Sequence, residues 1–280
     1  MTNFKQLTLM LAVLLGLVTL APALAFAQSY GASVTANTSA NVGAAGASAN
    51  VSGSATLTAA ETKAISRGDQ EITRRIQALN DLNTRVQGMQ AVTDSFKQNL
   101  AASIQTEITT LTTLKAKIDA DTDLATLKTD IQSITKSYRV YVLILPQGRI
   151  AAAADRVVTI VSMMSTLGSK LQARVQTASS AGNDTTALTA ALTDMSSKLQ
   201  DAQTQAQAAV TATASLQPDN GNATVMASNT AALKQARTDI QTATKDLQAA
   251  RKDITTVVSG LAKFNANVNA SSTTQTSTTP

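Results

Sequence analysis

Three aspartates, Asp119, Asp121 and Asp123, are the first residues of this chain whose type and spacing suggest a chemical function. They occupy every second position, as the acidic residues do at the start of a calcium-binding loop. Carboxylate oxygens are ligands that Ca²⁺ prefers, and Asp130 stands at the twelfth position of such a loop. The match is incomplete, because the sixth position is Leu124 where the sharp turn needs glycine, and the twelfth is not glutamate. The three aspartates are therefore only weak candidates for a metal site.

The same aspartates have a simpler use at the start of a helix. An N-cap side chain accepts a hydrogen bond from a free backbone N–H of the first turn, and a carboxylate there complements the helix dipole. We expect Asp121 or Thr122 to cap the helix that follows, and Asp123 to complement its dipole.

A second candidate site is apolar. The run VYVLIL at residues 140–145 is the densest apolar stretch after the N-terminal segment, and a proline follows it. The run could bind a partner or a membrane beside a bend, or it could be buried on all sides where helices converge, and we favour burial. The candidate partner-contact residues are Tyr138, Tyr141, Val142, Leu145 and Pro146.

Composition argues against catalysis. The chain has no His, no Cys and no Trp, so an active site would have to rest on paired carboxylates or on a Ser/Lys dyad. The acidic residues fall mostly at helix-surface positions, and no glycine-rich phosphate loop is present. We expect no enzyme activity and no cofactor.

Charge and aromatic content argue against nucleic-acid binding. The 23 Lys and Arg residues are scattered among 18 acidic residues, and the chain has only 3 Tyr and 4 Phe for stacking on bases. Without cysteine there is no disulfide framework, so stability must come from burial of apolar residues. Many of these are alanines, which favours an extended bundle over a thick globular core.

The ends of the chain predict export and two segments without fixed structure. Lys5, an apolar stretch at 7–21, and Ala25 and Ala27 beyond a proline are typical of a signal peptide covering 1–27, although an uncleaved anchor stays open. Residues 28–57 are a low-complexity linker of small and polar residues, and 266–280 has a similar composition.

Between these ends, apolar residues recur at helical spacing. Helices are expected at about 58–88, 95–119, 124–145, 150–180, 185–216 and 223–265. The last one carries a heptad stripe, in which apolar residues alternate at steps of three and four. Its members are Leu233, Ala236, Ile240, Ala243, Leu247, Ala250, Ile254, Val257, Leu261 and Phe264.

These elements predict an all-α fold, an elongated antiparallel helical bundle with coiled-coil-like heptad seams at 58–265. Pro146 should interrupt the third helix, with Gly148 adding slack. Segment lengths favour a bundle of the first, fourth, fifth and sixth helices, from which the second and third project as an arm at about 94–145. The alternative folds that arm back at Pro146.

Three stretches, KIDADTDLATLKTDIQSITKSYRVY, LPQGRIAAAADRV and ASLQPDNGNATVMASNTAALK, resemble uncharacterised exported helical proteins of small-genome bacteria. This resemblance implies no activity and no functional residues. We expect an exported, non-catalytic structural or adhesive protein of the cell surface, periplasm or extracellular space, which contacts a protein partner or itself through helix faces. The alternative is an exchangeable amphipathic-helix binder of lipid or an apolar ligand. Membrane contact is not favoured.

Overall fold

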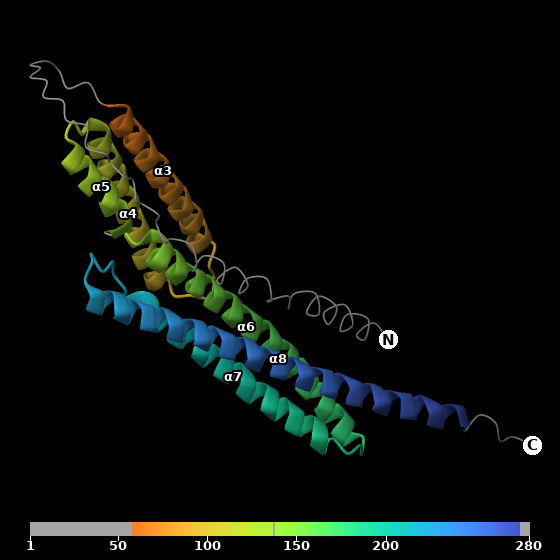
Figure 1. Cartoon of the computed structure of the whole chain (residues 1–280). Coiled ribbons are helices and arrows are strands. Elements are labelled where there is room, and N and C mark those ends of the chain that lie inside the picture. The colour runs from red at the N-terminus through yellow and green to blue at the C-terminus, as the bar shows by residue number, and fades with distance from the viewer. Residues whose placement is uncertain (1–57, 137, 275–280) are drawn as a thin grey trace, which may run out of the picture. The chain divides into compact units, whose positions relative to one another are not determined.

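The computed structural model describes residues 58–136 and 138–274, with side chains up to 264. The segments for which we expected a signal peptide, 1–27, and a linker, 28–57, lie outside this range. Within the described residues the chain forms six α-helices and one short π-helix, and no strand (Figure 1). The expected all-α fold is confirmed.

Helices α3 (Ala59–Gln87) and α4 (Asp94–Ala120) form the first hairpin. The hydroxyl of Thr58 accepts from the backbone N–H of Glu61, whose carboxylate accepts from the N–H of Thr58, so α3 begins with a capping box. Thr93 caps α4 by accepting from the N–H of Phe96. The chain reverses completely in the short turn between these two helices.

The chain then passes through α5 (Leu124–Lys136) and the π-helix η1 (Val140–Ile144) into α6 (Leu145–Ser180). We expected Pro146 to end a helix, and this expectation was wrong. Pro146 lies in the first turn of α6, directly after η1, and a first turn tolerates proline because its N–H groups have no partner within that helix. The break lies earlier, at Arg139, which has a left-handed φ of 42°.

Two groups of helices share α6. The first group consists of α3, α4 and α5, and the beginning of α6 extends it along α3. Gly68 lies against Ile131, and Gly148 lies against Leu82 further along both segments, so α3 runs parallel to the path from α5 into α6. The core between them is made of Ile72, Leu79, Leu82, Val86, Ile104, Leu111, Ile118, Leu127, Ile134, Val140, Ile144 and Ala151.

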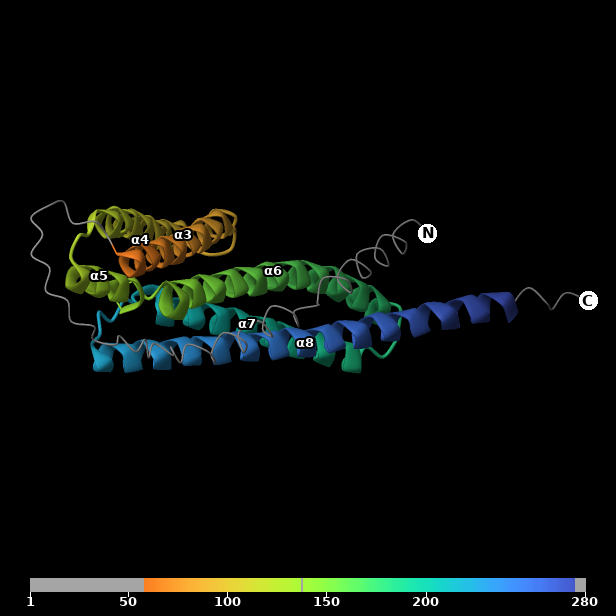
Figure 2. The ribbon, with the colours of Figure 1, turned by 45° about the horizontal axis from the view of Figure 1, so that its top comes forward.

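The second group consists of α6, α7 (Thr186–Ala214) and α8 (Ala223–Thr274), which lie side by side in both views (Figures 1 and 2). The heptad stripe of α8 is buried from Leu233 to Val257, where every member is at most 4% exposed. On α7, Ala202, Ala206 and Ala209 are completely buried. Alanines on both helices permit a close approach of the two backbones.

These contacts differ from the predicted topology. Helix α3 packs on α4, α5 and the beginning of α6 rather than along α7 and α8, so α4 and α5 do not stand off as a two-helix arm. A long-range contact holds the turn after α3 in place. Asp155 of α6 accepts three backbone hydrogen bonds there, from Gln90, Ala91 and Val92 at 2.8, 2.5 and 3.2 Å.

The end of α8 extends into the segment at 266–280 for which we expected no fixed structure. Helix α8 reaches Thr274, and residues 275–280 lie outside the described range. Each residue added to a formed helix gains one backbone hydrogen bond, so extending the helix costs little free energy. Polar side chains alone therefore do not end the helix.

Candidate functional site

The three spaced aspartates serve separate local tasks. Oδ2 of Asp123 accepts from the N–H and the hydroxyl of Thr126 at 2.7 and 2.8 Å, and these bonds lower the pKa of Asp123. Asp123 is therefore the N-cap of α5, the role that we had expected Asp121 or Thr122 to play. Asp119 instead pairs with Lys115 at 3.0 Å.

Asp121 faces the carboxylate of Asp130. Burial raises the pKa of Asp121, and the charge of Asp130 raises it further. Lys117 neutralises this pair from one side, with its Nζ 2.9 Å from Oδ1 of Asp130. Among the described residues no group of three or more acidic side chains is arranged to hold a metal ion.

The apolar run at 140–145 is divided between core and surface, so neither sequence interpretation describes it fully. Val140, Leu143 and Ile144 are buried, whereas Tyr141 is 44% and Val142 is 60% exposed. In this single helical turn Val140, Leu143 and Ile144 share the face toward the core, and Tyr141 and Val142 share the face toward solvent.

The other candidate partner-contact residues are partly or wholly covered. Pro146 is buried and Leu145 is half-buried. Tyr138 is half-buried, and its hydroxyl lies 3.4 Å from the backbone oxygen of Thr110. The guanidinium carbon of the buried Arg75 lies 4.9 Å from the ring centre of Tyr141, which holds that ring by a cation–π contact.

We call residues 138–144 the joint, because the two helical groups meet there. Its central contact was missed by sequence reasoning. Arg139 binds Asp219 through two nitrogens, with Nε 2.9 Å from Oδ2 and Nη2 donating to Oδ1 at 3.0 Å. Asp219 is buried in the turn between α7 and α8, and it also accepts from the N–H of Gly221 at 2.9 Å. The Arg139 guanidinium is the main reason that the pKa of Asp219 is lowered.

A second residue missed by sequence reasoning faces the same joint from α4. Glu107 is half-buried, and its Oε2 has no hydrogen-bond partner. Burial raises the pKa of Glu107 to about 7. Burial also raises the pKa of Tyr138, and the negative charge of Glu107 adds to that shift. The only sequence signal for Glu107 is its isolation, since no oppositely charged residue stands three or four positions away.

One helical segment of the described residues, Leu124–Ser180, is apolar enough by length and composition to cross a membrane. Its most apolar window has a mean hydropathy of 1.4, and 44% of that window is buried. The segment contains α5, η1 and α6, whose buried faces already pack against both helical groups.

Comparisons with protein-family models, with curated proteins and with solved structures find no match to this chain. The functional argument therefore rests on the geometry of the chain itself.

Proposed function

We propose that this chain is an exported, non-catalytic helical protein of the cell surface or extracellular space, which acts by binding a protein partner or a second copy. The observation that carries the proposal is the set of exposed apolar side chains on the two segments that Arg139 joins. Tyr141 and Val142 follow this residue closely in the chain, and its Nη2 lies 3.9 Å from Sδ of Met226. With Val225, these side chains make up four of the six large apolar residues exposed in the described part of the chain.

The position of these residues supports a contact function. Exposed apolar side chains that gather in one region favour a binding surface, whereas single ones are ordinary. Arg139 and Asp219 hold the two sides of the joint together, so the exposed side chains sit on a braced framework. A preorganised surface loses less conformational entropy when it binds.

Site-specific photocrosslinking tests this proposal. The photoreactive residue p-benzoylphenylalanine replaces Val142, and a matched control replaces Met163, which is 38% exposed on α6 away from the joint. We expect the label at 142, and not that at 163, to capture a distinct protein or a second copy when intact cells producing the chain are irradiated. Equal capture at the two positions, or none at 142, would argue against a contact role for the joint.

The apolar segment Leu124–Ser180 favours one second candidate function, reversible binding of lipid. In that function the helical groups would separate and present their apolar faces to a membrane. Flotation of the purified chain with liposomes of neutral and of anionic lipid separates the two proposals. Firm flotation would favour lipid binding, and a chain left at the bottom of the gradient would favour protein contact.

A further inference from the structure

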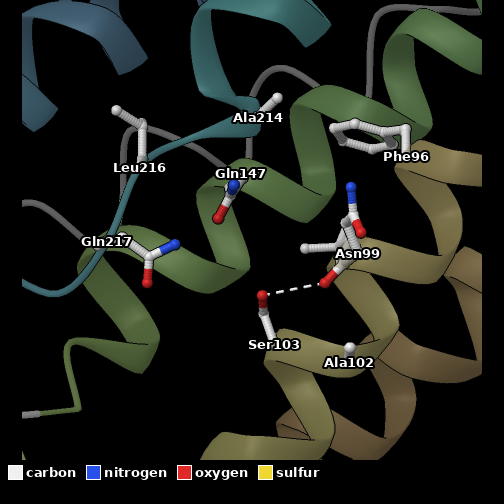
Figure 3. A pocket seen from close by; sticks show the side chains of 9 residues that line it. Phe96, Asn99, Ala102, Ser103, Gln147, Ala214, Leu216 and Gln217 are labelled. Atoms are coloured by element: carbon white, nitrogen blue, oxygen red, sulfur yellow. Dashed lines mark hydrogen bonds between the residues drawn. The ribbon is translucent and has the colours of Figure 1, made fainter.

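A groove opens where the first turn of α6 meets the side of α4 and the segment that follows α7 (Figure 3). Its volume is about 390 Å³, which lies within the usual range for small-molecule sites of roughly 300–1,000 Å³. The residues that determine its chemistry are Phe96, Asn99, Ser103, Gln147, Leu216 and Gln217.

The polar wall of the groove carries no charge. No Lys, Arg, Asp or Glu lines it, and its polar groups are the carboxamides of Asn99, Gln147 and Gln217 and the hydroxyl of Ser103. Each carboxamide offers two N–H donors and one acceptor oxygen. A charged ligand would lose hydration free energy on entering the groove and would find no opposite charge there to offset the loss. The groove therefore favours a neutral ligand with several hydrogen-bonding groups.

A hydrogen bond to the backbone fixes the orientation of the Gln147 carboxamide in this wall. Gln147 is only 6% exposed, and its Nε2 donates to the backbone oxygen of Thr213 at 2.5 Å. A flipped amide would place two oxygens against each other, so its Oε1 is directed away from α7 and toward Gln217 and Ser103 (Figure 3). This fixed acceptor is open to a donor on the ligand, which a hydroxyl group supplies.

The remaining wall is apolar. Phe96, Leu100 and Leu216 stand around the same space, and Ala102 is exposed beside them. A suitable ligand therefore has an apolar C–H face together with a rim of groups that both donate and accept hydrogen bonds. A sugar ring combines these properties without charge.

We propose that this groove binds a neutral saccharide, one of whose hydroxyl groups donates to Oε1 of Gln147. Asn99 and Gln217 bind further hydroxyl groups at the rim. This inference goes beyond the proposed protein contact and does not depend on it, because the groove lies apart from Tyr141 and Val142.

Saturation-transfer NMR on the full chain tests the saccharide proposal. The probes are glucose, galactose, mannose and N-acetylglucosamine, together with the neutral peptide Ala-Ser-Asn-Ala. We expect saturation of the ring protons of at least one sugar, with a dissociation constant of about 1 mM.

Two variants assign that signal to the groove. Ala102→Phe fills its opening from an exposed position of α4, and Ala173→Phe places the same side chain at an exposed position of α6 away from it. We expect the first to abolish the sugar signal and the second to leave it unchanged. Gln147→Met removes the acceptor and should weaken binding at least tenfold, provided that its circular dichroism matches the parent chain.

Three results would overturn the proposal. The first is no saturation of any sugar, and the second is sugar binding that survives in Ala102→Phe. The third is saturation of the peptide alone, which would assign the groove to a polypeptide segment instead.

Discussion

Two glycines on facing segments should respond oppositely to the same substitution. In a helix interior, Gly→Ala stabilises by about 0.8–1.0 kcal/mol through backbone entropy. At Gly68 of α3 a new Cβ would lie 3.5 Å from Cγ1 of Ile131 and 3.6 Å from the side chain of Ile118, which are ordinary contacts. We therefore expect Gly68→Ala to raise the free energy of unfolding by about 1 kcal/mol.

At Gly148 of α6 the same methyl group has no room. It would lie 2.3 Å from Cδ1, 2.7 Å from Cδ2 and 2.9 Å from Cγ of Leu82, which is only 5% exposed. Overpacking of this kind costs about 1–3 kcal/mol. Subtracting the helix gain of about 1 kcal/mol leaves a net loss of roughly 0–2 kcal/mol, so the two alanine variants should differ by about 1–3 kcal/mol.

Urea unfolding followed by circular dichroism measures the free energy of unfolding of both variants. Their midpoint urea concentrations can be compared if the free energy falls with urea at the same slope in each. A double variant isolates the contact. Leu82→Ala alone should cost about 2–5 kcal/mol. Adding Gly148→Ala to it should now stabilise, because the new methyl group enters the space that Leu82 left. If Gly148→Ala stabilised the parent chain as much as Gly68→Ala, α3 would not pack on the first turn of α6.

Three further predictions concern other contacts. Ala243→Leu should lower the free energy of unfolding by about 1–3 kcal/mol, because Ala243 is completely buried. An unchanged melting temperature would show that α7 does not approach α8 closely at Ala243. Glu107→Gln should raise the melting temperature at pH 8 by several degrees. Because the pKa of Glu107 is raised in the folded state, the parent chain loses stability as pH rises from 4.5 to about 7, and the variant should not show this loss in thermal melts. Asp219→Ala should cost about 1–3 kcal/mol at pH 7 in thermal melts. This difference should shrink as pH falls below 3.8, because the lowered pKa stabilises the fold only while Asp219 is ionised, and a difference independent of pH would exclude the Arg139 pair as its cause.

Sequence periodicity predicted the helices, apart from the boundary between α5 and α6, and it predicted the buried stripe of α8. The spacing from Leu233 to Val257 predicts the buried face of α8, and these residues are buried in the structure. The breaks expected between helices at 119–124 and at 216–223 also coincide with turns of the chain. These features are local, because a helix of fixed pitch determines which residues share a face before any partner is known.

Only the tertiary structure decided which buried faces meet. The periodicity of α3 is compatible with packing on α7 and α8, yet the turn after Gly88 reverses the chain and Asp155 holds that turn against α6. The contacts that build the joint and the groove also join distant positions, Arg139 with Asp219 and Gln147 with Thr213. The sequence contains all four residues but does not indicate which of them pair. Their burial, orientation and charge state depend on how the helical groups close, which is a long-range property of the fold.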